Sequence, residues 1–431
     1  MTGATDTDFL ACPRCGSALR ELSCTSCRQD FPTFDGVACL FAEPQSAAAD
    51  WRNRWRLERQ NLNRLEQIEA DTPRLQRVRD GARQQRSSIE AVLAPMITND
   101  VGGARETLLG LRTRLPSHHA PTSYNTQICR DWVWGQEETE QAYELFGGRK
   151  AFRGARVGVL GAGAGGLAHR VAADAEAVVA VDSNPLLCLI AARMNGGEPL
   201  AFVETPISPK TSEDASIVHQ LKPGPRRDNL THIWADAIRA PFHEGSFDIV
   251  ITHWLVDVID VDPADLSAQI NALLRLGGRW FNQGSVAFNH DDPTRNLSPE
   301  ELLAAVEEKG FAASSSYSAQ LPYLCSPHSR HHRHEEVFGW HTTKQQAMDR
   351  PRLDHLPAWL SRSSDRIPLS ESFRNQAATT RIHAAIMSLI DGQRSLDDIA
   401  LELERNGLMP QAEAREAVRG MLTRMWEESR R

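Results

Sequence analysis

The stretch VGVLGAGAGGLAHRVAADAEAVVAVDSNP, residues 157–185, joins two apolar runs through a glycine-rich loop and a helix-like segment. Four of the six residues from Gly161 to Gly166 are glycine. Glycine permits the tight turn that brings backbone close to a ligand, and the N-terminus of the following helix offers free N–H groups. The second run ends at Asp182, which is placed to accept hydrogen bonds from ribose hydroxyls. This pattern predicts a nucleotide-binding strand, loop, helix and strand.

Further apolar runs alternate with helical patterns after this unit. The runs are THIWADA (231–237), FDIVITHWLVD (247–257) and GGRWFNQGSVAF (277–288), and the helical segment PADLSAQINALLRL (263–276) separates the last two. Strands that alternate with helices at this spacing form a parallel sheet with helices on both faces. The sequence therefore predicts an α/β fold with a doubly wound, Rossmann-like sheet.

The chain has 431 residues, which is more than one domain usually contains. It has no apolar run long enough to cross a membrane and no secretory signal at its start, so we expect a cytoplasmic protein that does not engage a membrane. Its net charge of −8 argues against a broad nucleic-acid surface. The predicted domains are a ribbon (1–42), a helical region (43–122), the α/β domain (123–345), a linker (346–366) and a small C-terminal unit (367–431).

Four cysteines near the start predict a metal site. Cys12, Cys15, Cys24 and Cys27 form a CxxC–x8–CxxC pattern, which can present four thiolates tetrahedrally to zinc. Four protein ligands leave no position for a reacting water, so this zinc would be structural. A redox or incidental pair is the alternative. The segment resembles the zinc-ribbon activator subunit of tRNA and release-factor methyltransferases, which implies a ribbon that contacts a partner protein or its own catalytic domain.

The helical region 43–122 is rich in Arg, Glu, Gln and Leu, with an apolar residue at every third or fourth position. This spacing predicts amphipathic helices, and Pro73 is expected to separate two of them. The charged face is interpreted as solvent-facing, and binding to a polynucleotide is the alternative.

The glycine loop alone fits either a dinucleotide or S-adenosylmethionine. Asp236 follows the third predicted strand, and the fourth predicted strand ends beside the same loop. This order of parts resembles the class I methyltransferase fold. The resemblance implies that the glycine loop carries the methionine part of S-adenosylmethionine, Asp182 the ribose and Asp236 the adenine. An NAD-type oxidoreductase and a catalytically inactive fold remain as alternatives.

Segments outside this core narrow the resemblance. NTQICRDWVWGQEETEQAYELF (125–146), the insertion 204–237, ITHWLVDVID (251–260) and LSPEELLAAVEEKGF (297–311) resemble the carnosine N-methyltransferase family. The similarity covers residues 123–345. It implies methyl transfer to an imidazole nitrogen of a histidine-containing small molecule or peptide.

The resemblance implies a set of cofactor-binding residues. Arg130 suits the carboxylate of the cofactor because a guanidinium can donate two hydrogen bonds to it. An ordinary helix surface is the alternative for Gln127 and Arg130, and the role of His253 is open. The full set is Gln127, Arg130, Gly161, Ala162, Gly163, Asp182, Ser183, Asp236, Ala237 and His253.

The imidazole-orienting carboxylate of the family falls on Asp257. A carboxylate that accepts the ring N–H fixes the tautomer and stabilises the imidazolium formed on transfer. A helix N-cap is the alternative role of Asp257. The sequence departs from the family at its other substrate positions, which fall on Asn289, His290, His332 and His334.

A histidine-rich stretch, residues 325–334, contains Cys325, His328, His331, His332 and His334. An altered substrate pocket, a second metal site and an ordinary polar loop are all compatible with it. A metal-dependent enzyme that uses this stretch is therefore an alternative function.

The C-terminal unit has a helix start at Ser395, with Asp398 three residues later in the manner of a capping box. The unit resembles winged-helix peptide-recognition domains, in which a leader peptide adds as a strand to a sheet edge. Packing within the chain or in a homodimer, DNA binding, and a peptide-binding scaffold with an inactive core are the alternatives.

Overall fold

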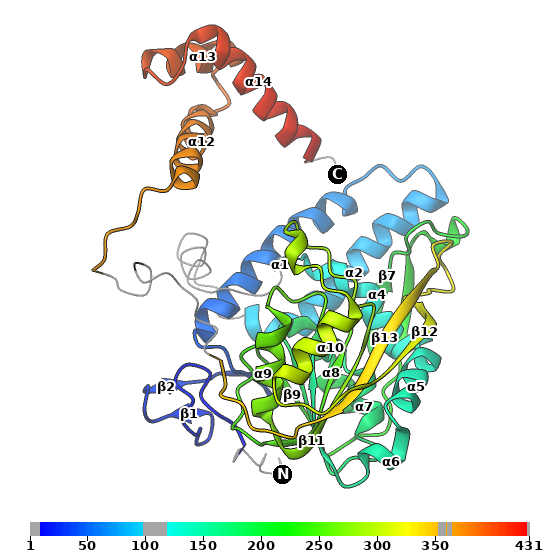
Figure 1. Cartoon of the computed structure of the whole chain (residues 1–431). Helices are drawn as coiled ribbons and strands as arrows, with labels where there is room; N and C mark the ends of the chain where they lie inside the picture. Colours follow the sequence, from blue (N-terminus) through cyan, green and yellow to red (C-terminus); the bar gives the residue numbers. More distant parts are fainter. Residues whose placement is uncertain (1–8, 98–118, 352–358, 360–363, 429–431) are drawn as a thin grey trace. The chain divides into compact units, whose positions relative to one another are not determined.

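The computed structural model describes residues 9–97, 119–351, 359 and 364–428 (Figure 1). The chain divides into two compact units, Met1–Leu353 and Asp354–Arg431. The first contains the sheet and the candidate site, and the second is a small helical unit.

A nine-stranded sheet organises the described part of the first unit, in the order β12-β13-β11-β10-β5-β6-β9-β4-β3. Strands β11, β10, β5, β6, β9 and β4 are parallel to one another, whereas β13 pairs antiparallel with β11 and β12, and β3 pairs antiparallel with β4. The strands are β3 (Thr33–Phe34), β4 (Val37–Cys39), β5 (Arg156–Leu160), β6 (Ala177–Asp182), β9 (Leu230–Trp234), β10 (Phe247–His253), β11 (Leu274–Gly284), β12 (Ser315–Tyr323) and β13 (Arg333–Thr343).

The central strands are buried on both faces, as expected for nearly continuous apolar runs in a parallel sheet. Val159 and Ile251 pack on one face, and Leu160 and Val250 pack on the other. Helices cover both faces, so the predicted doubly wound, Rossmann-like fold is confirmed.

The strand order reverses between β5 and β10. From β5 the chain proceeds through β6 to β9 on one side, then returns to place β10 on the other side of β5. In open α/β sheets, ligands bind at such a switch point, outside the carboxyl ends of the strands. The glycine loop follows β5 and therefore lies at this point.

One face of the sheet packs against the helices that precede β5, against α7 after β5 and against α8 after β6. The other face packs against α9, α10 and the N-terminal ribbon. The helices and short helical turns are α1 (Pro44–Glu66), α2 (Pro73–Ile97), η1 (Pro121–Tyr124), α4 (Asn125–Cys129), the π-helical turn η2 (Arg130–Trp134), α5 (Gln136–Leu145), α6 (Gly148–Phe152), α7 (Gly166–Val171), α8 (Pro185–Asn195), η3 (Glu213–Ala215), α9 (Pro263–Leu273), η4 (Pro293–Arg295) and α10 (Pro299–Glu308).

The N-terminal segment joins the central sheet instead of forming a separate domain, which corrects the predicted boundary at residue 42. Strands β1 (Ser23–Cys24) and β2 (Gln29–Asp30) form a hairpin of their own, but β4 pairs in parallel with β9. Leu10 and Phe31 belong to the same apolar cluster as the sheet. The ribbon is therefore built into the fold of the α/β domain.

Two helices follow the ribbon, and α2 begins at Pro73 as the sequence predicts. The buried side chains of Trp51, Trp55 and Ile89 pack with Trp234 of β9. The rest of the predicted helical region, from 98 to 118, lies outside the described residues.

Two other boundaries differ from the sequence prediction. Helix α9 ends at Leu273, before the end of the predicted helical segment at Leu276, and β11 begins at Leu274, before the predicted run starts at Gly277. The predicted linker 346–366 begins too early, because Arg350 donates hydrogen bonds to the carbonyls of Ala240 and Phe242. Residues 346–350 are thus held against the domain.

The described residues of the second unit form three helices, α12 (Glu371–Leu389), α13 (Leu396–Arg405) and α14 (Gln411–Glu428). The capping box at the start of α13 is confirmed, because Ser395 and Asp398 exchange backbone–side chain hydrogen bonds. Residues 364–428 contain no strand. The predicted winged helix therefore lacks its wing here, and so does the sheet edge to which a leader peptide would add.

None of the helices in the described residues has the length and apolar character needed to span a bilayer.

Deleting either end of the chain tests this division. We expect deletion of residues 354–431 to leave a soluble, cooperatively folding protein. Deletion of residues 1–42 should give insoluble protein, because it removes β4 from the edge of β9 and exposes the cluster that contains Leu10 and Phe31. Soluble yield and thermal melting measure both effects, and a well-folded protein lacking residues 1–42 would contradict the corrected boundary.

Candidate functional site

A cavity of about 680 Å³ opens at the carboxyl ends of β5, β6, β9 and β10. This volume lies within the range of small-molecule sites. All ten residues predicted to bind the cofactor line it: Gln127, Arg130, Gly161, Ala162, Gly163, Asp182, Ser183, Asp236, Ala237 and His253. The structure thus brings together residues that are up to 126 positions apart in the sequence.

The glycine loop owes its shape to backbone that L side chains rarely adopt. Gly161 and Gly163 have φ angles of 69° and 59°. A Cβ on Gly161 would also lie 2.8 Å from the side chain of Leu255. The Asp182 carboxylate accepts hydrogen bonds from the N–H of Gly163 at 2.8 Å and of Asn184 at 2.9 Å, which joins the loop to the end of β6.

Asp131 is a site residue that the sequence did not reveal. Its carboxylate accepts a hydrogen bond from the N–H of Gly166, at the start of α7, at 3.1 Å. It also pairs with Arg130 at 2.8 Å. A carboxylate therefore already occupies the position where a Rossmann dinucleotide would place its pyrophosphate.

The cavity lining carries an excess of negative charge. It contains four carboxyl groups, those of Asp131, Glu138, Asp182 and Asp236, against the single guanidinium of Arg130. Burial raises the pKa of Asp182 to about 6, although backbone hydrogen bonds partly oppose this effect. Burial also raises the pKa of Asp236. Buried carboxylates of this kind are stabilised by a cationic ligand and destabilised by an anionic one.

Arg130 lies between two of these acids. Its side chain is 13% exposed and approaches Asp131 at 2.8 Å and Glu138 at 3.6 Å. Burial alone would lower the pKa of Arg130, but these two carboxylates hold it above its usual value. Arg130 is therefore charged in the cavity and held by α5, which rules out the alternative of an ordinary helix surface.

Glu138 is the second residue that the sequence did not reveal. Burial raises the pKa of Glu138 to about 7, and Arg130 opposes this shift. Its Oε1 is buried without a hydrogen-bond partner among the described residues. Glu138 thus lines the cavity as a carboxyl group that changes protonation near neutral pH. Nothing in the sequence distinguishes it from the exposed Glu137 beside it.

An aromatic wall closes the cavity beyond β10. The rings of Trp254 and Tyr323 lie 4.0 Å apart between centroids. Trp254 adopts φ 54°, an unusual backbone conformation for a bulky residue and of the kind that clusters at functional sites. Beside this wall, burial lowers the pKa of His253 to about 3, so its ring is neutral and its Nε2 has no hydrogen-bond partner among the described residues.

Asp257 lies behind this wall and does not line the cavity. Its carboxylate accepts hydrogen bonds from the Ser285 hydroxyl and the Ala287 N–H, which ties the loop after β10 to the loop after β11. It does not cap a helix, because the N-cap of α9 is Asp262. The N-cap alternative is therefore wrong, the carboxylate joins these two loops, and a role of Asp257 toward an imidazole stays a prediction.

The other predicted substrate residues do not reach the cavity, which corrects their assignment. Asn289, His332 and His334 are exposed. His290 is half-buried, and its backbone exchanges hydrogen bonds with Asn296 while its ring stacks on Phe288. Asn289, His290 and His332 lie in loops, and His334 is the second residue of β13, so position in the fold rather than residue type decides this outcome.

The histidine-rich stretch does not gather into a metal site. His331, His332 and His334 are exposed, the Cys325 thiol donates to backbone carbonyls, and His328 pairs with Asp214. Among the described residues these five side chains are not brought within coordinating distance of one another. The alternative of a metal-dependent enzyme built on this stretch is therefore not supported.

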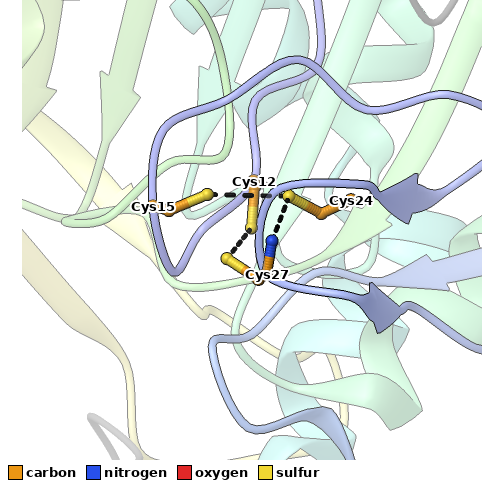
Figure 2. A group of neighbouring side chains, drawn as sticks. All are labelled: Cys12, Cys15, Cys24 and Cys27. Carbon is orange, nitrogen blue, oxygen red and sulfur yellow. Dashed lines mark hydrogen bonds between the residues drawn. The ribbon is translucent and has the colours of Figure 1, made fainter.

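The four N-terminal cysteines do converge (Figure 2). Cys12 and Cys27 have their sulfurs 3.8 Å apart, and Cys15 and Cys24 have theirs 3.6 Å apart. Four sulfurs bound tetrahedrally at 2.3 Å from zinc would lie about 3.8 Å from one another. The N–H of Cys27 also donates to the sulfur of Cys24. The four residues thus fit a zinc ion, and the spacing is too long for disulfides.

Comparison of the sequence with protein-family models gives no match, and comparison with curated proteins gives none either. Several solved structures match part of the chain. They include a SAM-dependent methyltransferase from Aquifex aeolicus, at 11% identity and a TM-score of 0.34, covering 53% of this chain and 100% of that one. A SAM-dependent O-methyltransferase from Thermotoga maritima is 12% identical with a TM-score of 0.30, covering 58% and 74%.

A third similar structure is phosphoethanolamine N-methyltransferase 2 from Haemonchus contortus in complex with S-adenosyl-L-methionine. It is 14% identical with a TM-score of 0.35, and the match covers 52% of this chain and 56% of that one. These matches concern the fold, and what the cavity binds has to follow from its own residues.

Substitution of Asp182 tests the cavity as a binding site. We expect Asp182→Ala to weaken binding of S-adenosylmethionine about 10- to 100-fold, because hydrogen bonds to a charged group contribute about 1.5–3 kcal/mol. Binding to the unchanged protein should also weaken as the pH falls through about 6, where Asp182 becomes protonated. Calorimetry measures both effects. The exposed Asp228→Ala is the control, and equal affinities for the two variants would contradict the assignment.

Metal analysis tests the cysteine cluster. Cys24→Ala should lose one zinc per chain and lower the melting temperature, because the cluster packs against the sheet. The buried Cys39→Ala, a cysteine outside the cluster, should keep that zinc. Zinc content unchanged by Cys24→Ala would show that the four sulfurs do not hold the ion.

Proposed function

We propose that the protein is an S-adenosylmethionine-dependent methyltransferase. The observation that carries this proposal is the charge of the cavity, where four carboxyl groups face one guanidinium and Asp131 already occupies the N–H of Gly166. S-adenosylmethionine brings a sulfonium and an ammonium against one carboxylate and so has a net positive charge. A dinucleotide would place its negatively charged pyrophosphate beside Asp131, which makes the NAD-type alternative unfavourable.

Each of these residues would contact a different part of the cofactor. Asp182 would accept hydrogen bonds from the ribose hydroxyls at the end of β6, and Asp236, with Ala237, would contact the adenine beyond β9. Asp131 would attract the ammonium group, and Arg130 would bind the carboxylate. When bound, the cofactor supplies an activated methyl group, so the chain needs no nucleophile of its own.

For the methyl acceptor we propose an imidazole nitrogen of a histidine-containing small molecule or peptide. Trp254 and Tyr323 offer aromatic ring surface on which such a ring could pack. Glu138 lines the same cavity and can accept the proton of the ring N–H. The resemblance assigned this function to Asp257, but Glu138 is the carboxyl group that faces the cavity.

Glu138 would act on the acceptor in two ways. Its ionised carboxylate would hold one ring nitrogen as the N–H tautomer and leave the lone pair of the other free to attack the methyl group. As positive charge develops on the ring, the carboxylate would stabilise it and take up the proton. A pKa of about 7 lets Glu138 take up and release a proton near neutral pH.

Turnover separates this proposal from an inactive scaffold. Histidine, histidine dipeptides and histidine-bearing peptides are incubated with the protein and S-adenosylmethionine, and mass spectrometry follows a gain of one methyl group. Methylation of an imidazole supports both levels of the proposal. Methylation of other acceptors alone would overturn the imidazole assignment, and cofactor binding without any transfer would favour the scaffold.

Replacing Glu138 tests its role in the transfer. Glu138→Gln should lower kcat about 10²- to 10⁴-fold, the contribution typical of a general base, with little change in cofactor affinity. In the unchanged protein kcat/KM should rise with pH through about 7, because the ionised carboxylate is the active form, and the variant should lose this rise. Glu137→Gln, an exposed neighbour, is the control. Equal kcat for both variants would contradict the role.

A further inference from the structure

A second cluster of metal-ligand side chains lies beside the cofactor cavity, outside the N-terminal ribbon. Cys129 is the last residue of α4, Glu204 ends strand β7 (Leu200–Glu204) and His219 lies in strand β8 (Ile217–Leu221). One sulfur, one carboxylate oxygen and one imidazole nitrogen of these residues lie within 4.8 Å of one another. From these contacts we propose that Cys129, Glu204 and His219 bind a structural zinc ion.

The hairpin holds two of these ligands on one face. In the antiparallel register Glu204 lies opposite Ile217, and Phe202 lies opposite His219. Glu204 and His219 are therefore diagonal neighbours, a position from which long side chains meet. The distance from His219 Nε2 to Glu204 Oε2 is 2.7 Å.

Glu204 carries the observation that points to a ligand. Its side chain is only 1% exposed, and both of its hydrogen-bond partners, His219 and Trp134, use Oε2. Oε1 is buried with no hydrogen-bond partner among the described residues. A buried carboxylate oxygen left without a partner is costly, and a cation would satisfy it.

The charges balance with a divalent ion. Cys129 as a thiolate and Glu204 as a carboxylate carry two negative charges, and His219 binds as a neutral ring. Zinc would neutralise the three ligands within a buried site. Sulfur, nitrogen and oxygen together are donors that zinc accepts, whereas calcium and magnesium require oxygen ligands.

His328 lies next to this cluster, outside the group of three ligand atoms that are within 4.8 Å of one another, and a shift of its ring would let it provide the fourth ligand. Its ring centroid lies 5.6 Å from that of His219, and two imidazoles bound tetrahedrally to one zinc would have centroids about 5 Å apart. Asp214 pairs with Nδ1 of His328 at 2.8 Å, which leaves Nε2 free and resembles the carboxylate that orients a metal-binding histidine. Four protein ligands would make the site closed and structural.

Such an ion would fasten the segment that forms one wall of the cavity. Cys129 directly precedes Arg130 and Asp131, and the indole of Trp134 in the same turn donates to Glu204. The ion would join this turn to the β7–β8 hairpin and to the loop that carries His328. Its loss should therefore loosen the cavity without removing any residue that lines it.

Zinc counting by mass spectrometry on the purified full chain tests the proposal. We expect two zinc ions per chain in the unchanged protein, one in Cys129→Ala and in His219→Ala, and two in the control Cys188→Ala, which removes a buried thiol outside both clusters. The ribbon zinc that remains in the first two variants shows that they are folded. Cys24→Ala should keep only the second ion.

Two further variants keep the test decisive if one of the alanine variants does not fold. Glu204→Gln keeps the shape of the side chain, and it should release one zinc to a chelator faster than the unchanged protein does. His328→Ala should do the same. One zinc per chain in the unchanged protein, or two in His219→Ala, would overturn the proposal and leave Glu204 and His219 as a buried ion pair.

Discussion

The accumulation of carboxyl groups at the point where the strand order reverses is the constraint on which the site depends. Asp182 ends β6, Asp236 follows β9, and Asp131 reaches the start of α7 from the preceding helical turn. Each is buried enough that its negative charge would be costly without compensation. Backbone N–H groups supply part of that compensation and also fix the glycine loop. The remainder is left for a ligand that brings hydrogen-bond donors or positive charge.

The N-terminal ribbon covers one edge of the sheet, and an uncovered edge is the weakest part of an open sheet. A parallel sheet that ended at β9 would expose an edge, but the N-terminal ribbon supplies β4 and β3 there. The same ribbon packs residues into the cluster beneath α9 and α10. A zinc ion in the ribbon would therefore stabilise the domain that forms the cavity, rather than a module attached to it by a linker.

The sequence predicted the cofactor half of the cavity because the relevant residues follow strands. Strand ends in a doubly wound sheet converge by topology, so Gly161, Asp182 and Asp236 could be placed together from their local patterns. Asp131 and Glu138 could not, because they belong to helical turns whose orientation depends on packing. His332 and His334 were placed wrongly for the same reason: alignment by residue order says nothing about whether a loop or the first residues of a strand meet the cavity.

The prediction of metal sites was limited in the same way, because a local sequence pattern does not fix contacts that depend on packing. The ribbon cysteines are close in sequence, and a short loop keeps them close in space. Their spacing was therefore sufficient to predict that they converge. The histidine-rich stretch has equal local density, yet it forms the loop that leads into β13, and several of its side chains point to solvent. Cys129, Glu204 and His219 come from three separate elements and have no pattern in the sequence. Their convergence, with one carboxylate oxygen left unpaired in the interior, is a property of the folded chain, and it follows from the pairing of β7 with β8 against the turn that holds Arg130.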